Sequence, residues 1–120
     1  MFSEAVLDHF RNPRHAGELP NATVRVEASN PVCGDVLQLA ARIENGRILE
    51  ARFLCRGCTT AIACGSYLAE QLSGKLVDEL KETDANSISE ALGALPAATF
   101  HGAQLAADAL DAFLRQCRQG

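Results

Sequence analysis

The feature that most constrains the fold is an Asn-Gly pair, Asn45-Gly46, which lies between two β-prone runs. An Asn-Gly pair readily supplies the two positive φ angles of a type I′ turn, the turn that joins antiparallel neighbours. The flanking runs, residues 36–43 and 48–54, are therefore predicted to form a β-hairpin. A third run, residues 23–27, alternates polar and apolar side chains as a half-buried strand does. We expect a three-stranded antiparallel sheet with one face left for other elements to cover.

The segments around these strands carry helical signals. Ser3 can cap a short helix that ends at the Asn-Pro pair of residues 12–13. The apolar residues of this helix fall on one side: Val6, Leu7 and Phe10. Residues 61–72 are rich in helix formers and stop at a Ser-Gly pair, residues 73–74. A further helix is predicted over residues 76–81.

Two more helices are predicted near the C-terminus. Ser87 and Glu90 form an S-x-x-E capping box that would open a short helix ending near Leu92. The last helix spans residues 102–116 and has an apolar stripe that suits packing on the sheet. The stripe consists of Leu105, Ala106, Ala109, Leu110, Phe113 and Leu114. We therefore expect one α+β domain over residues 1–120, with a three-stranded antiparallel sheet covered by helices.

Composition and charge argue against several classes of function. The net charge is −4 and no cluster of Lys and Arg stands out, which argues against nucleic acid or a membrane surface as partner. No apolar run approaches the roughly 20 residues that cross a bilayer. The N-terminal residues lack the pattern of a signal peptide, so we expect a cytoplasmic protein. In that compartment the five cysteines are expected to be thiols or metal ligands rather than disulfides.

Metal-type ligands occur at three places near the ends of predicted elements. Two candidate ligands, Cys33 and Asp35, precede the second predicted strand. At the end of the third strand lies Cys55, and Cys58 follows three residues later. The last candidate, His101, directly precedes the last predicted helix. Antiparallel partners bring the start of the second strand beside the end of the third, so Cys33 and Cys58 can be neighbours. Two thiolates, a carboxylate and an imidazole suit zinc or an iron-sulfur cluster. The predicted site residues are Cys33, Asp35, Cys58 and His101.

Three motifs resemble signatures of the NifU/IscU-type iron-sulfur cluster assembly scaffolds, in order and spacing. They are NPVCGD at residues 30–35, RGC through AIA at residues 56–63, and LP followed by FH at residues 95–101. The opening SEAVLDHFRNPR and the QLAADA of the last helix are also similar to that family. The resemblance spans nearly the whole chain.

The resemblance implies an α+β scaffold that assembles a transient [2Fe-2S] cluster and passes it to apo-proteins. Sulfur would come from a cysteine desulfurase, and zinc is an alternative occupant. By position, Cys33 and Cys58 would be thiolate ligands, Asp35 the carboxylate associated with a labile cluster, and His101 the neighbouring donor. A homodimer could supply missing ligands by symmetry.

The chain departs from the family pattern at two places. The family has a cysteine directly after the histidine, where this chain has Gly102. Residues 95–99 read LPAAT in place of the family's LPPVK, the stretch that a dedicated Hsp70 system recognises. Cys117 lies 15 residues beyond Gly102, about 22 Å along a helix, and is too far to replace the missing thiol.

Two other cysteines need separate consideration. Cys64 follows Cys58 by six residues and is expected in the core. Cys55 is expected to be a strand-end residue, although a turn at Gly57 could bring its sulfur to the same metal as Cys58. A thioredoxin-like redox pair is disfavoured because no βαβ pattern is present. His9 and His15 are predicted to be surface or structural residues.

Two functions follow. The first is a non-enzymatic scaffold or carrier for iron, a [2Fe-2S] cluster or zinc. The second is a zinc-bound or metal-free binding module that engages the assembly machinery without building a cluster. A thiol enzyme is disfavoured, because no Cys and His are spaced as a nucleophile, base and orienting group.

Overall fold

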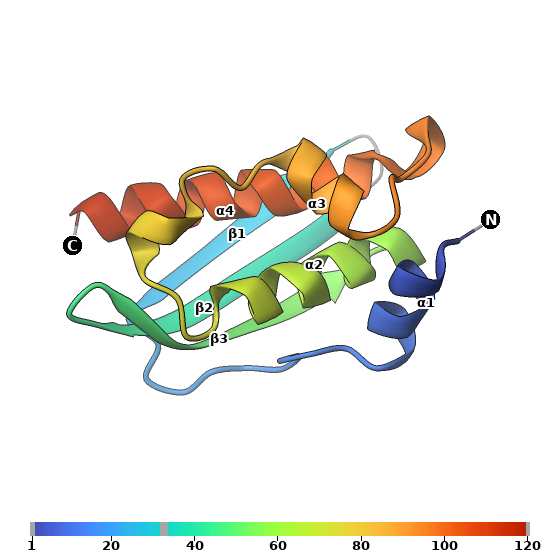
Figure 1. Cartoon of the computed structure of the whole chain (residues 1–120). Helices are drawn as coiled ribbons and strands as arrows, with labels where there is room; N and C mark the ends of the chain where they lie inside the picture. Colours follow the sequence, from blue (N-terminus) through green and yellow to red (C-terminus); the bar gives the residue numbers. More distant parts are fainter. Residues whose placement is uncertain (1, 32–33, 120) are drawn as a thin grey trace.

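The elements follow one another along the chain in the order that the sequence predicts. The computed structural model describes residues 2–31 and 34–119, with only the backbone at residue 119. The elements are α1 (Glu4–Arg11), β1 (Val24–Asn30), β2 (Asp35–Glu44), β3 (Arg47–Arg56), α2 (Thr59–Leu72), the 3-10 helix η1 (Val77–Leu80), α3 (Ala85–Ala91), the 3-10 helix η2 (Ala97–Thr99) and α4 (His101–Gln119). Helices α2 and α4 lie side by side over one face of the sheet (Figure 1).

The sheet is a three-stranded antiparallel meander in the order β1-β2-β3. Asn45 and Gly46 have φ angles of 53° and 77°, as the predicted hairpin turn requires. The register pairs Leu37 with Cys55 and Val36 with Arg56, so the start of β2 lies beside the end of β3. The predicted α+β fold, with an antiparallel sheet covered by helices, is confirmed.

The core lies between the sheet and the helices. Leu37 and Leu39 on β2 and Phe53 on β3 are buried on the covered face. All six residues of the predicted apolar stripe on α4 are buried: Leu105, Ala106, Ala109, Leu110, Phe113 and Leu114. Within the described residues, no helix is long and apolar enough to cross a membrane.

Two predicted helices differ in detail. Residues 76–81 form only the single 3-10 turn η1. Helix α3 begins earlier than predicted, because Asp84 rather than Ser87 is its N-cap. The Asp84 carboxylate accepts from the Ser87 backbone N–H at 2.8 Å, and the Asp84 N–H donates to the Ser87 hydroxyl at 2.9 Å. Both residues can cap a helix, and this reciprocal pair satisfies the backbone N–H groups of both Asp84 and Ser87.

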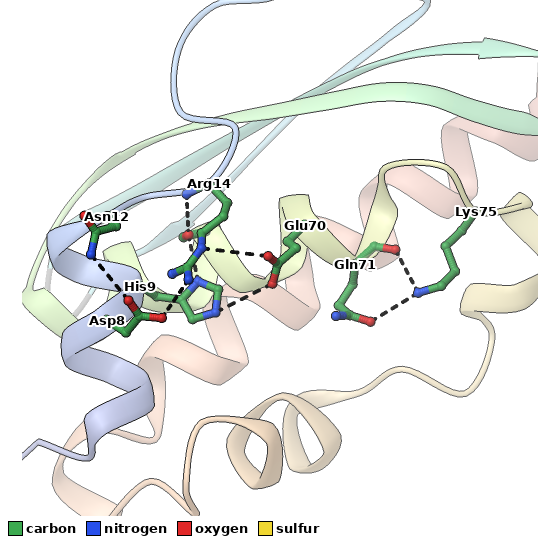
Figure 2. Close-up of polar contacts among 8 residues, drawn as sticks. Asp8, His9, Asn12, Arg14, Glu70, Gln71 and Lys75 are labelled. Atoms are coloured by element: carbon green, nitrogen blue, oxygen red, sulfur yellow. Dashed lines mark hydrogen bonds and ion pairs between the residues drawn. The ribbon is translucent and has the colours of Figure 1, made fainter.

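Helix α1 packs on α2 through a polar cluster rather than through Phe10. Ser3 caps the helix as predicted, but Phe10 is 39% exposed while His9 is only 8% exposed. Nδ1 of His9 lies 2.8 Å from the hydroxyl of Ser66 on α2, and the Arg14 backbone N–H donates to the same hydroxyl at 2.8 Å. The apolar side of this helix is therefore buried at Val6 but not at Phe10, and His9 adds a buried polar contact to α2 (Figure 2).

Candidate metal site

Three donor side chains meet at the end of the sheet away from the Asn45-Gly46 turn. Asp35 is the first residue of β2, Cys58 follows β3 and is the N-cap of α2, and His101 is the first residue of α4. The hairpin register and the packing of α2 against α4 bring these three starting points together. One donor atom from each residue lies within 4.8 Å of the other two.

The imidazole lies between the other two donors. Nε2 of His101 is 3.6 Å from Sγ of Cys58 and 3.8 Å from Oδ2 of Asp35. The separation of nitrogen and carboxylate oxygen is too long for a good hydrogen bond. Ligands bound to one tetrahedral ion at about 2.0–2.3 Å would lie about 3.3–3.8 Å from one another. The observed spacing therefore approaches what a single metal ion between these atoms requires.

The carboxylate of Asp35 is buried without full compensation. Asp35 is 7% exposed, and its Oδ2 accepts no hydrogen bond from the residues that the structure describes. A buried charged oxygen without a partner is costly unless a cation or donor can reach it. Two helices begin next to it, α2 and α4, and their N-termini carry partial positive charge. The buried oxygen is the kind of group that a metal ion would satisfy.

Gly57 makes the close placement of Asp35 possible. A Cβ atom at this position would lie 2.7 Å from Cγ of Asp35, closer than real Cβ contacts allow. The backbone before Cys58 therefore passes directly against the carboxylate. Any side chain at position 57 would push Asp35 out of its present position.

The thiol of Cys58 is available for binding. Cys58 is exposed, and as N-cap of α2 it makes no side-chain capping bond. Its backbone carbonyl accepts from the Ile62 N–H at 3.1 Å, so the helix begins without using the sulfur. An exposed thiol beside a buried carboxylate leaves the site open to an incoming ion.

Gly102, which stands where the resembled family has a cysteine, is a buried contact between helices. A Cβ atom there would lie 3.1 Å from Cγ2 of Thr60 and 3.2 Å from the backbone nitrogen of Ala61. The first turn of α4 thus packs closely on the first turn of α2. A side chain at position 102 would require the two helices to move apart by a few tenths of an ångström.

The remaining described cysteines have different surroundings. Cys64 is completely buried, as predicted for a core residue, and burial raises the pKa of its thiol to about 12. Cys117 lines a cavity of about 700 Å³ beside Asn45 and Gly46, at the hairpin end of the sheet. Cys55 is half-buried, and burial together with the charges of Asp35 and Cys58 raises its pKa to about 11.

Three of the four predicted site residues come together, and the fourth lies outside the described residues. Asp35, Cys58 and His101 form the group, whereas the prediction for Cys33 falls on a residue that the structure does not describe. Sequence reasoning did not identify Gly57 as the residue that fits the backbone against Asp35. Its signal was present, because a glycine between two candidate ligands often marks a close backbone approach.

The chain is similar to proteins that are named as iron-sulfur cluster assembly scaffolds. Residues 1–119 match the family model of the NifU-like N-terminal domain. The chain is 39% identical over 110 residues to the iron-sulfur cluster assembly scaffold protein IscU 1 of Archaeoglobus fulgidus, covering 92% of this chain and 72% of the relative. It is 38% identical over 115 residues to the scaffold protein IscU of Escherichia coli K12, covering 92% and 89%. A Drosophila melanogaster relative, 37% identical over 95% of this chain and 76% of its own length, is named an iron-sulfur cluster assembly enzyme.

Solved structures share the fold. A Fervidobacterium islandicum protein assigned as a cluster assembly scaffold for the SUF system superposes with a TM-score of 0.78 at 23% identity, covering 94% of this chain and 96% of the other. The N-terminal part of a NifU-like protein from Brucella abortus gives a TM-score of 0.79 at 17% identity, covering 98% and 94%. At these identities the likeness supports the fold alone.

Proposed function

Because the chain belongs to the NifU-like N-terminal domain family, we propose that it is a scaffold or carrier in iron-sulfur cluster assembly. Its cargo would be iron, a transient [2Fe-2S] cluster or zinc. The ligands that we assign are Cys33, Asp35, Cys58 and His101, and residues 1–120 would act as one NifU/IscU-like domain. The protein would hold and hand over its cargo rather than catalyse a reaction of its own.

The observation that carries this proposal is the meeting of a thiol, an imidazole and a buried carboxylate at one point. His101 Nε2 lies 3.6 Å from the Cys58 sulfur and 3.8 Å from the unpartnered Asp35 oxygen. This mixed donor set suits borderline-soft ions such as zinc and iron. The residues come from three separate elements, so only the folded chain brings them together.

The same donor set supports transient rather than permanent binding. Structural metal centres are usually closed by four strong thiolate or imidazole ligands. Here one donor is a carboxylate, and the thiol of Cys58 is exposed to solvent. An acceptor protein can therefore approach the cargo directly. The partners that follow from the family are a cysteine desulfurase, which supplies sulfur, and apo-protein acceptors.

A second function is favoured by Gly102. With no thiol at this position and with the helices packed closely around it, the chain has one sulfur donor fewer than the family motif that it resembles. Zinc, or no metal, would then suffice for a binding module that engages the assembly machinery without building a cluster. Zinc binding would contribute folding free energy, so this module would melt at a lower temperature in chelator.

Anaerobic reconstitution separates the two functions. Metal-free protein is incubated with ferrous iron, cysteine and a cysteine desulfurase, and visible absorption is recorded. A scaffold gives sulfur-to-iron charge-transfer bands in wild type and in a Cys117→Ser control, and the bands disappear in Cys58→Ser. If wild type stays colourless while Gly102→Cys develops colour, the scaffold function is wrong for this chain.

A further inference from the structure

Cys55 lies on the same face of the sheet as the core and the candidate metal site. Along β3, Ala51 and Phe53 point toward the helices and are buried, and strand alternation places Cys55 on their side. Its cross-strand partner is Leu37, which is completely buried on the covered face. The thiol of Cys55 is therefore directed into the layer between the sheet and the helices, half-buried at its edge.

The strand register places Cys55 beside Asp35. Leu37 pairs with Cys55 and Val36 with Arg56, so the next position, Gly57, meets Asp35. Cys55 and Asp35 are then diagonal neighbours on one face of an antiparallel pair, a separation of about 7–8 Å between backbones that side chains can bridge. The carboxylate thus lies against Gly57, which has Cys55 two residues before it in the chain and Cys58 directly after it.

Gly57 allows the Asp35 carboxylate to lie close to the end of β3. It has no side chain, and the Asp35 carboxylate lies against its backbone. Burial, and then the charge of the nearby Asp35 carboxylate, raise the pKa of the Cys55 thiol, which is consistent with the closeness of these two side chains. Cys55 is not within the group whose donor atoms all lie within 4.8 Å of one another, so its side chain would have to turn toward Asp35 to join them.

The family motif that the chain resembles has one thiol more than this chain. Zinc and iron in sulfur-containing sites usually take four ligands; Asp35, Cys58 and His101 provide three among the described residues, and Cys33, which lies outside them, is the fourth that we assign. Gly102 provides none and is packed against Thr60 and Ala61. Of the described cysteines other than Cys58, Cys64 is completely buried and Cys117 lines a cavity at the opposite end of the sheet.

We propose that Cys55 is an additional thiolate ligand of this site and supplies the sulfur that Gly102 cannot. This inference rests on the proposed function, namely that Asp35, Cys58 and His101 bind a metal cargo. On binding, the Cys55 thiol releases its proton to solvent and its sulfur donates an electron pair to the metal. No oxidant or reductant is needed.

Titration of the metal-free protein with Co²⁺ tests the proposal, because sulfur-to-cobalt charge-transfer absorption reports thiolate ligands. Cys55→Ser and Cys55→Ala should each lower this absorption by about one third, the loss of one sulfur among Cys33, Cys55 and Cys58. Cys117→Ser is the matched control, since it removes a half-buried thiol far from the site, and should match wild type. Circular dichroism melting verifies that each variant is folded.

A rescue experiment distinguishes ligation from packing. Adding Gly102→Cys to Cys55→Ser should restore the absorption, whereas adding Gly102→Ala, which makes the same helix contact without a thiol, should not. If Cys55→Ser absorbs as strongly as Cys117→Ser while Cys58→Ser loses the band, Cys55 is not a ligand and the proposed function stands. If wild type gives no cobalt band at all, both the proposed function and this inference are wrong.

Discussion

Two histidines that lie on helices at the same end of the molecule have opposite surroundings. His9 on α1 contacts the Ser66 hydroxyl at 2.8 Å, and its Nε2 faces Glu70 at 3.8 Å (Figure 2). Its ring packs edge-on against Tyr67. His101 on α4 faces the Cys58 thiol at 3.6 Å, within hydrogen-bond range for sulfur, and a buried carboxylate oxygen at 3.8 Å, which is longer than a good hydrogen bond. One cluster is held mostly by contacts among its own protein groups, and the other brings three metal-type donors together.

The hydrogen bonds around His9 indicate a structural cluster, whereas the donors around His101 indicate a candidate binding site. The Ser66 hydroxyl accepts from the Arg14 N–H, and Arg14 also pairs with Asp8 at 2.6 Å and approaches Glu70 at 3.8 Å. These contacts fix α1 on α2 without any ligand. The Asp35 oxygen has no such partner among the described residues. Buried polar groups are normally satisfied, and three described side-chain atoms are exceptions: Arg14 Nη1, Thr60 Oγ1 and Asp35 Oδ2. Of these, the Asp35 oxygen is a metal-type donor, and it belongs to a group whose donor atoms lie within 4.8 Å of one another, so it indicates where an ion would bind.

The largest effect is expected from Cys58→Ser. It removes an exposed thiol from the group of donors, so zinc affinity should fall by at least about 100-fold, the upper end of what loss of a supporting residue around a metal costs. Competition with a chromophoric chelator measures the affinity. The metal-free protein should melt as wild type does, because the side chain makes no capping bond. Unchanged zinc affinity would place the metal elsewhere.

Gly57→Ala should weaken the site without removing a ligand. The new methyl group would meet the Asp35 carboxylate at 2.7 Å and displace it. We expect zinc affinity to fall by about 10–100-fold, as for other changes that misplace a ligand. Arg56→Ala, one residue earlier and exposed, is the control and should bind as wild type does. Equal affinities for the two variants would show that Asp35 does not contribute.

Ser66→Ala should affect stability alone. It leaves the Arg14 backbone N–H and His9 Nδ1 without their buried partner, at a cost of about 1–3 kcal/mol in the free energy of unfolding. Denaturant unfolding of metal-free protein measures this cost. Zinc affinity should not change. Asn12→Ala, which removes only an exposed contact to Asp8, serves as control. A large loss of zinc affinity in Ser66→Ala would contradict the separation of the two clusters.

The smallest effect is a pH dependence that comes from His9. Burial, and then the charge of Arg14, lower its pKa below the usual value of 6.5. The unfolded chain therefore binds this proton more readily than the folded chain, and stability rises with pH. His9 should have its full stabilising effect above about pH 6.5, and this should be lost as pH falls from there through the folded-state pKa. Unfolding free energies of metal-free wild type and His9→Gln, compared from pH 7.5 to pH 5, should converge as the pH falls. Parallel curves would show that His9 does not titrate in this way.

Local signals were sufficient to predict most of the fold. The Asn45-Gly46 turn depends on two adjacent residues, and the α4 stripe depends on spacing within one helix. The start of α3 was misplaced because Asp84 and Ser87 are both good caps, and only the hydrogen bonds between them decide which residue begins the helix. Helix η1 covers only Val77–Leu80, and nothing in the sequence pattern of residues 76–81 predicts this shorter length.

Features that depend on contacts between distant residues were harder to predict. The burial of His9 requires Ser66, which lies 57 residues away. The sequence predicted that Asp35, Cys58 and His101 could meet, because hairpin geometry and the family motifs both place them there, and the described geometry agrees. It could not predict how closely Gly102 packs on Thr60, or that the register would place Cys55 diagonally from Asp35.

X-ray absorption spectroscopy of the zinc-loaded protein tests most directly whether these side chains surround one ion. We expect a mixed ligand shell with sulfur at about 2.3 Å and nitrogen or oxygen at about 2.0–2.2 Å. The sulfur contribution should fall in Cys58→Ser, and the imidazole scattering should disappear in His101→Ala. A shell of nitrogen and oxygen alone in wild type, unchanged in both variants, would contradict the assignment of this site.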